Sequence, residues 1–291
     1  MLNYLIYFFE KYSYPKEDSD FLLSVYKKIA ADGSALDIWN KALGSYEESL
    51  ECDYKQIVKD ADKVAEILSI HEYTLELLIF MCMSRKMKEY YAEKGISEEI
   101  FDNTILDLRY NMDECKLIYG IVGTFTAPWH IEFFQLKVFG LGRLQFEIDS
   151  FGKNYENGEV KLTPESKVIN IHIPRSLVPL TEESCKESYK MAKEFFKGQY
   201  DEPCAFICRS WLLYPENEKL FPKGSNTYKF FSSFEIISSS INKDNHNLWR
   251  LFDTLERNPA KLPTDTSMRR AFVNHLLAGG KTGGGVGIFF A

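Results

Sequence analysis

Apolar residues in the first 125 positions recur three and four residues apart, the spacing of amphipathic helices, and no segment alternates as a strand does. The pattern predicts helices at 20–30, 54–70, 72–92 and from Ser97 onward. Gly95 is suited to end the third helix, and the hydroxyl of Ser97 is suited to cap the fourth. The expected inward residues of the first two helices are Phe21, Leu22, Val25, Tyr26 and Ile29, then Ile57, Val58, Ala61, Val64, Ile67 and Leu68.

The pattern changes after Gly123, where apolar and polar residues begin to alternate. It predicts a strand at 141–149 with a hairpin partner at 159–163, then strands at 167–173 and 204–213, a β-rich segment at 227–241 and a short last strand. The predicted helices of this half are 182–197, 215–221, 248–256 and 267–278. The fold class is therefore α+β. An α-helical N-terminal domain (1–125) precedes a mixed, largely antiparallel α/β domain (126–291).

Composition agrees with two globular domains, since 291 residues exceed the usual size of one core. The net charge is −7, and it is uneven: residues 1–125 hold 14 basic and 23 acidic side chains, whereas residues 126–291 hold 21 and 19. Because no basic face gathers, we expect no nucleic-acid partner. No apolar run approaches the roughly 20 residues that span a bilayer, so we expect no membrane partner. The start of the chain lacks the basic region of a signal peptide, and we expect a cytoplasmic location.

The cysteines and histidines give no metal-binding pattern. The six cysteines include no Cys-x-x-Cys pair, and the five histidines are scattered along the chain. We therefore expect buried thiols and no metal.

The glycine-rich segment 279–287 contains Gly-Lys-Thr, which resembles the end of a phosphate-binding loop. It follows a helix and precedes a strand, the reverse of the order such a loop needs, so we reject an ATPase. We interpret these glycines as a helix stop and a flexible approach to the last strand.

Four motifs of the second half go beyond fold class: Leu141-Gly-Arg-Leu-Gln-Phe-Glu, Ile171-His-Ile-Pro-Arg, Cys208-Arg-Ser-Trp-Leu-Leu-Tyr-Pro, and Ser225-Asn with Lys229-Phe230. With these motifs and its glycine-rich ending, the chain resembles a family of bacterial two-domain proteins described as acyltransferases. The resemblance implies an α-helical N-terminal domain and a C-terminal domain like the GNAT superfamily of N-acyltransferases. It also implies acyl-CoA (acetyl-CoA) as co-substrate and a small-molecule amine as acceptor.

In GNAT enzymes the turn after the central strand binds the diphosphate of acyl-CoA. The resemblance places that turn at 174–181, with Arg175, Ser176 and Thr181 as the cofactor-binding residues. Backbone N–H groups approach phosphate best where glycines are present. This turn has no glycine and two prolines, and Glu182 and Glu183 follow it. An alternative is therefore a binding or scaffold protein that has lost the turn, and a third option is a different acyl carrier.

The candidate catalytic residues are His172, Glu147 and Tyr214. His172 or Glu147 is suited to deprotonate an amine, and the resemblance makes Tyr214 the acid for the departing thiolate. The plainer interpretations are a structural histidine, a solvated strand face and a packing tyrosine.

The candidate substrate-binding residues are Gln145, Arg143, Cys208 and Ser210. Gln145 and Arg143 share the polar face of Glu147, and Ser210 shares the face of Cys208 in an ideal strand. Cys208 is either an acyl-accepting nucleophile or a buried core thiol.

Overall fold

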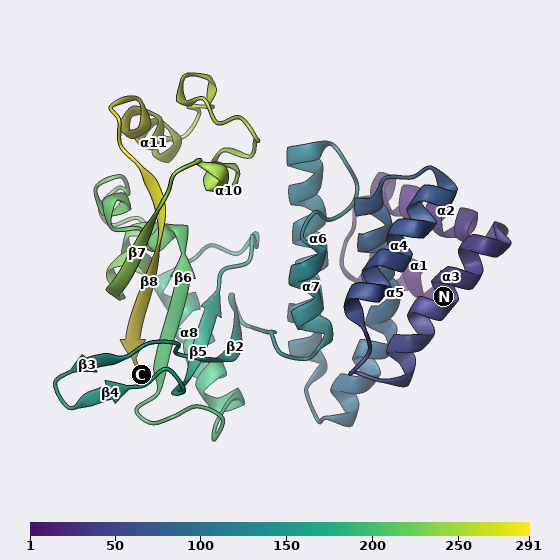
Figure 1. Cartoon of the computed structure of the whole chain (residues 1–291), viewed down its shortest axis with the longest axis horizontal. Helices are drawn as coiled ribbons and strands as arrows, with labels where there is room; N and C mark the ends of the chain where they lie inside the picture. Colours follow the sequence, from purple (N-terminus) through teal and green to yellow (C-terminus); the bar gives the residue numbers. More distant parts are fainter. The chain divides into compact units, whose positions relative to one another are not determined.

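The computed structural model describes all residues, 1–291, and divides into two compact units, Met1–Gly140 and Leu141–Ala291 (Figure 1). The first unit is helical and the second is built on a mixed sheet, so the α+β prediction is confirmed. Helix α7 (Ala127–Phe134) lies beyond the predicted boundary at 125 and belongs to the helical unit, because it packs against helices of that unit.

The helical unit contains seven helices. Besides α7 they are α1 (Leu2–Lys11), α2 (Lys16–Ala31), α3 (Gly33–Glu48), α4 (Tyr54–Leu68), α5 (Glu72–Glu93) and α6 (Glu98–Tyr119). Helix α5 is the central one: its residues 77–84 are all buried, as expected of a helix surrounded by others. The predicted cap is confirmed, since the Ser97 hydroxyl accepts the N–H of Ile100.

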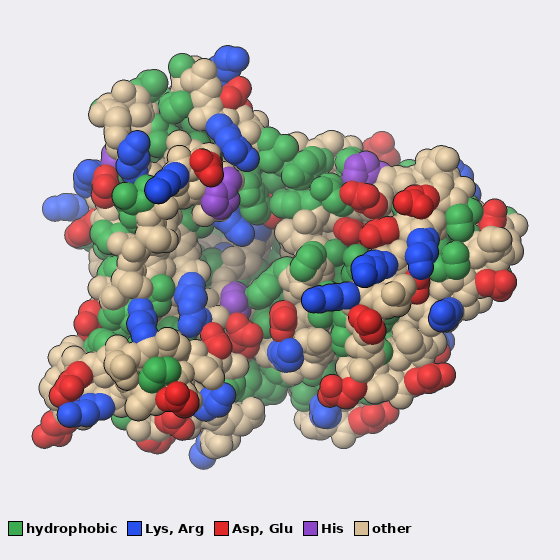
Figure 2. Space-filling view, in the orientation of Figure 1, with side chains coloured by type: hydrophobic (Ala, Val, Ile, Leu, Met, Phe, Trp, Pro, Cys, Tyr) green, Lys and Arg blue, Asp and Glu red, His purple; other side chains and the backbone are tan.

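Two residues of the predicted inward faces are exposed instead. Leu22, Val25 and Ile29 are buried, but Phe21 is 42% exposed and Ile67 is 43% exposed. Both lie to one side of the residues that their helices bury. On the face drawn in Figure 2, acidic and basic side chains are interspersed over the helical unit rather than gathered into one patch. No helix of the chain combines the length and the apolar character that crossing a membrane requires.

The second unit is built on a six-stranded sheet of order β1-β2-β5-β6-β8-β7. The strands are β1 (Phe139–Leu141), β2 (Leu144–Ser150), β5 (Lys167–His172), β6 (Ala205–Ser210), β7 (Glu235–Asn242) and β8 (Thr282–Phe290). A separate hairpin consists of β3 (Tyr155–Asn157) and β4 (Val160–Leu162). The helices are α8 (Glu182–Phe195), α9 (Asn226–Ser232), α10 (Trp249–Phe252) and α11 (Ser267–Leu277), with 3₁₀ turns η1 (Trp211–Leu213), η2 (Pro215–Lys219), η3 (His246–Leu248) and η4 (Pro259–Lys261).

Three predictions about this unit were wrong. Segment 159–163 does not pair with 141–149, because β4 pairs with β3, and the sheet neighbours of β2 are β1 and β5. Segment 227–241 begins as helix α9 and becomes strand β7 only at Glu235. The last strand is long rather than short, since β8 includes most of the glycine-rich segment.

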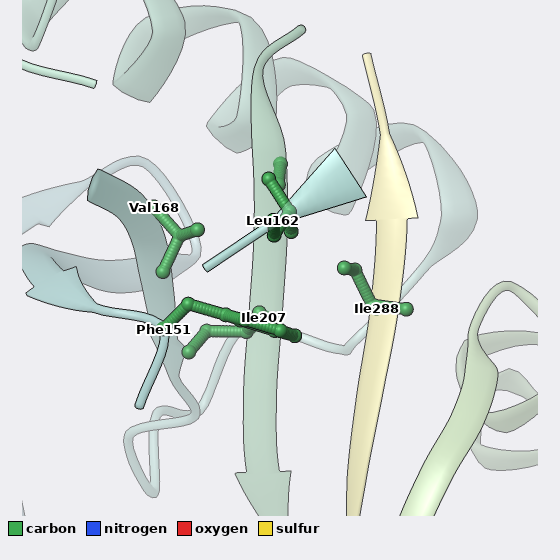
Figure 3. Close-up of a cluster of buried hydrophobic side chains, with 6 residues drawn as sticks. Phe151, Leu162, Val168, Ile207 and Ile288 are labelled. Carbon is green, nitrogen blue, oxygen red and sulfur yellow. The ribbon is translucent and has the colours of Figure 1, made fainter. Parts of the chain in front are cut away.

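Different elements pack on the two faces of the sheet. On one face Tyr189 of α8 contacts Phe206 and Phe289, with ring centroids 5.4 and 4.9 Å away. The other face is covered in part by the β3–β4 hairpin, which contributes Leu162 to a buried cluster (Figure 3). That cluster consists of Phe151, Leu162, Val168, Ala205, Ile207 and Ile288.

Strand β8 has glycine at alternate positions for a steric reason. A Cβ on Gly285 would lie 1.9 Å from the Leu213 carbonyl oxygen, and one on Gly283 would lie 2.4 Å from the ring of Tyr214. One on Gly287 would meet Phe234 at 2.7 Å. Because residues two apart share a face of a strand, these glycines give β8 one face without side chains, and the η1 turn packs on that face. The segment is therefore ordered strand, and its interpretation as a flexible approach was wrong.

Candidate functional site

The centre of the sheet contains one parallel strand pair, β5 and β6, whose pairing stops before either strand ends. The last paired residues are Ile171 of β5 and Cys208 of β6. Beyond them, the register still places His172 opposite Gln145 of β2 and Ser210 opposite Gly285 of β8. Strand β5 thus remains paired with β2, and β6 remains paired with β8, after the pairing of β5 with β6 has ended. The two strands therefore part at their carboxyl ends. In sheets with parallel strands, ligands bind at such ends.

A cluster of three polar side chains lies beside this point. The Nε2 atom of His172 is 2.8 Å from Oε1 of Glu147, and Nδ2 of Asn170 donates to the same oxygen at 2.8 Å. The register places Glu147 opposite Asn170, so the three side chains share a face. Glu147 and His172 are 20% and 24% exposed, and Asn170 is buried. The structure therefore brings two predicted catalytic residues into direct contact.

The contact determines the charge state of Glu147. Burial raises the pKa of Glu147, but the hydrogen bonds from His172 and Asn170 outweigh burial, and the pKa is lowered overall. Glu147 is therefore an ionised carboxylate at neutral pH and accepts hydrogen bonds only. Because this carboxylate only accepts, Nε2 of His172 is the donor in the 2.8 Å contact. This is the arrangement of a base held by a carboxylate.

Other polar side chains surround the pair. Gln145 is buried directly opposite His172 in the register. Arg209 of β6 pairs with Asp149 of β2 at 2.9 Å and contributes to the low pKa of Glu147. Asn170 and Arg209 are not among the site residues predicted from the sequence. The alternation around His172 could have indicated Asn170, which lies two residues away on the same strand.

The three predicted cofactor-binding residues lie in the post-β5 loop, residues 174–181, where each makes a contact within the chain. Arg175 pairs with Asp253 at 2.7 Å. The Ser176 hydroxyl accepts the N–H of Val178, and Thr181 caps α8 in a capping box with Ser184.

Arg143 lies in this loop region rather than on the polar face of Glu147, where the sequence analysis placed it. Nε of Arg143 donates to the Val178 carbonyl at 2.6 Å, and Nη1 donates to the Pro174 carbonyl at 3.1 Å. Arg143 is in the turn between β1 and β2, outside the alternation of β2, which is why the strand pattern misplaced it.

The structure does not bring Cys208, Ser210 or Tyr214 together with Glu147 and His172. Cys208 is buried, and burial raises the pKa of its thiol to about 12, so the thiol is protonated at neutral pH. The Ser210 hydroxyl accepts the N–H of Leu212 at the start of η1. The ring of Tyr214 packs on Gly283, and its hydroxyl donates to Glu216 at 3.3 Å. No group of three or more His, Cys, Asp or Glu side chains is placed to hold a metal ion.

Comparisons with known proteins match both units. Residues 3–136 match the model of an N-acyltransferase N-terminal domain, and residues 138–289 match the model of a GNAT-like C-terminal domain. No curated protein sequence matches the chain. A crystal structure of an acyltransferase in complex with decanoyl-CoA and teicoplanin has the same fold, with a TM-score of 0.77 at 18% identity. The match covers 97% of this chain and 86% of that one. An acyltransferase structure with decanoyl-CoA alone matches with a TM-score of 0.74 at 19% identity, over the same shares of the two chains.

Proposed function

The chain belongs to the family that joins an N-acyltransferase N-terminal domain to a GNAT-like C-terminal domain, and we propose that it transfers an acyl group from acyl-CoA directly to the amine of a small molecule. The observation that carries this proposal is the Glu147–His172 pair, which lies where β5 and β6 part. The crystallised relatives of the same fold bind acyl-CoA and, in one case, teicoplanin. These complexes support acyl-CoA as the donor here.

The parting strands suit the donor. We place the pantetheine arm of the donor between the carboxyl ends of β5 and β6, past the last paired residues Ile171 and Cys208. A thioester between the strand ends would lie near His172. The loop that follows β5 would then lie along the path toward the diphosphate.

The proposed reaction uses His172 as a base. Nδ1 of His172 accepts a proton from the amine as the amine nitrogen attacks the thioester carbonyl. The ionised Glu147 stabilises the imidazolium, and Asn170 holds the carboxylate in place through its hydrogen bond. The tetrahedral intermediate collapses to an amide as the carbon–sulfur bond breaks. The CoA thiolate takes a proton from water or from Tyr214, whose role as an acid stays a prediction.

The first test is calorimetric titration with acetyl-CoA, octanoyl-CoA and decanoyl-CoA. We expect saturable binding of at least one donor. Absence of binding at millimolar concentration would refute a CoA-dependent reaction and would favour the binding or scaffold alternative.

The second test measures turnover. A panel of small amines is incubated with the bound donor, amide products are identified by mass spectrometry, and the best acceptor is used for kinetics. We expect H172Q and E147Q to lower kcat by about 10²- to 10⁴-fold, the usual contribution of a general base, with donor affinity unchanged. The matched control is E156Q, on the exposed β3 strand, where Glu156 pairs with Lys161. Full activity in H172Q would refute the role of the pair.

A further inference from the structure

The post-β5 loop lacks the usual means of holding a loop in one conformation. Leu177 is 90% exposed and Val178 is 53% exposed, so the loop's apolar side chains bury little surface. The loop has no glycine, and its two prolines donate no backbone hydrogen bond. Within the loop, Ser176 and Thr181 make short-range hydrogen bonds only. A long-range contact is needed to relate the loop to the sheet.

Arg143 supplies that contact. Its guanidinium donates to Pro174 near the start of the loop and to Val178 four residues later. The planar guanidinium is suited to this role because its N–H groups diverge in a fixed geometry, so one side chain can hold two carbonyls at set positions.

The backbone of Arg143 is itself fixed to α8. Its N–H donates at 2.8 Å to the hydroxyl of Ser188, which is fully buried and donates in turn to the Ser184 carbonyl. Gly142 adopts a φ of +71°, and a Cβ there would lie 2.7 Å from the Ser188 hydroxyl. The turn before β2, the post-β5 loop and the first turns of α8 are therefore joined by hydrogen bonds through one residue.

The electrostatic effect of Arg143 on the loop favours an anion. A carbonyl oxygen repels a nearby anion, and the Arg143 guanidinium offsets that effect at the Pro174 and Val178 carbonyls by donating to both. Because the carbonyl and the N–H of a trans peptide point in opposite directions, drawing the Pro174 carbonyl toward Arg143 turns the N–H of Arg175 the other way. Arg143 thus combines a positive charge with an orientation of the loop's peptide groups.

Arg175 is held differently. Its guanidinium pairs with Asp253, which also pairs with Arg269 at 2.5 Å. Arg175, the arginine assigned to the cofactor from the sequence, is therefore held in an ion pair within the chain.

We propose that Arg143 is the positioning residue that shapes the post-β5 loop for the diphosphate of acyl-CoA, in place of the glycines that this loop lacks. This inference rests on the proposed function. It assigns to Arg143 an effect on donors that contain the diphosphate and none on thioesters that lack it.

The test compares R143Q, R143K and wild type. Calorimetry measures the Kd for CoA, and steady-state kinetics measures KM and kcat for acyl-CoA and for the corresponding acyl-pantetheine, which has no diphosphate. We expect R143Q to weaken CoA binding and to raise the KM for acyl-CoA by about 10- to 100-fold, as for the loss of hydrogen bonds from a charged group. The kcat/KM for acyl-pantetheine should change less than about twofold.

R143K separates geometry from charge. Its ammonium is a point charge that does not hold two carbonyls as the guanidinium does, so we expect it to bind CoA nearly as weakly as R143Q. The charge control is K161Q, in the β3–β4 hairpin, which precedes the amino end of β5 rather than following its carboxyl end. It should bind CoA like wild type. Hydrogen exchange should show faster exchange at residues 175–181 in R143Q and unchanged exchange in β5.

Three outcomes would overturn the inference. Wild-type affinity in R143Q removes any role of Arg143 in CoA binding. Wild-type affinity in R143K shows that charge alone acts. An equal loss of activity with acyl-CoA and acyl-pantetheine shows a general structural role. Failure of the wild-type protein to bind CoA refutes the proposed function itself, which makes the two failures distinguishable.

Discussion

Two neighbouring glycines of β8 should respond in opposite ways to the same substitution. Gly284 and Gly285 are adjacent in the strand, so a Cβ added to one points to the opposite face from a Cβ added to the other. The nearest atom to a Cβ on Gly284 is the Ser210 carbonyl oxygen at 3.9 Å, an ordinary contact. On Gly285 the nearest atom is the Leu213 carbonyl oxygen at 1.9 Å, and the Leu213 carbonyl carbon is at 2.5 Å. G284A and G285A therefore differ only in what the new methyl group meets.

The magnitudes follow from the two environments. In G284A the alanine restricts the unfolded chain and fits the strand, which should stabilise the protein by about 0.4–1 kcal/mol. In G285A the same gain is opposed by overpacking, which costs about 1–3 kcal/mol or more. The high end applies here, because the obstructing atoms are backbone and β8 is held between β6 and β7. We expect G285A to be less stable than G284A by about 2–3 kcal/mol.

The assay is urea denaturation of the full-length variants, followed by far-UV circular dichroism and by tryptophan fluorescence. Trp211 and Trp249 report on the second unit, so W39F/W129F backgrounds isolate the fluorescence of that unit. Equal midpoints for G284A and G285A would refute the argument that the alternate glycines exist for the close approach of η1.

Three further predictions concern titration, the thiol and the cap. Burial lowers the pKa of His130 to about 3, whereas in the unfolded chain the His130 imidazole takes up a proton below about pH 6.5. The free energy of unfolding therefore falls as the pH drops from 6.5 toward 3. Urea denaturation at pH 5 should show a loss of about 2 kcal/mol relative to pH 8, and an equal loss in H130Q would contradict this origin. C208A should keep acyl-transfer activity within about twofold, because the buried thiol is protonated; inactivity with native folding would restore the nucleophile interpretation. T181A should lower the free energy of unfolding by about 1 kcal/mol through loss of the capping box, whereas an unchanged midpoint in urea would contradict a stabilising cap.

Much of the candidate site was predictable because its signals are local. The alternation in 144–149 and 168–173 was enough to place Glu147 and His172 on polar positions of two strands. It could not show that these strands are neighbours, since the hairpin partner of 141–149 was expected at 159–163. Only the β2–β5 register brings Glu147 to 2.8 Å from His172 and places Asn170 beside both.

Arg143 shows the opposite case. The residue lies in a turn, and no local pattern relates it to a loop that begins 31 residues later. The pattern extended the face of β2 backward and assigned Arg143 to an acceptor site. The fold instead directs the side chain to the carbonyls of Pro174 and Val178, because the Ser188 hydroxyl fixes its backbone against α8.

The amino-acid sequence by itself determined four of the seven helices of the first unit, the Ser97 cap and the polar positions of the central strands. Helix periodicity and hydrogen bonds such as that from Ile100 to Ser97 depend on residues within four positions of each other. Tertiary structure alone decided which strands pair and what the glycines and Arg143 contact. Pairing and register depend on burial across the whole sheet. The β3–β4 hairpin packs on the cluster around Ile207 instead of joining the sheet beside β2, and the glycines of β8 lie directly against η1. These choices depend on contacts between residues far apart in the chain, and they place Glu147 and His172 where β5 and β6 part.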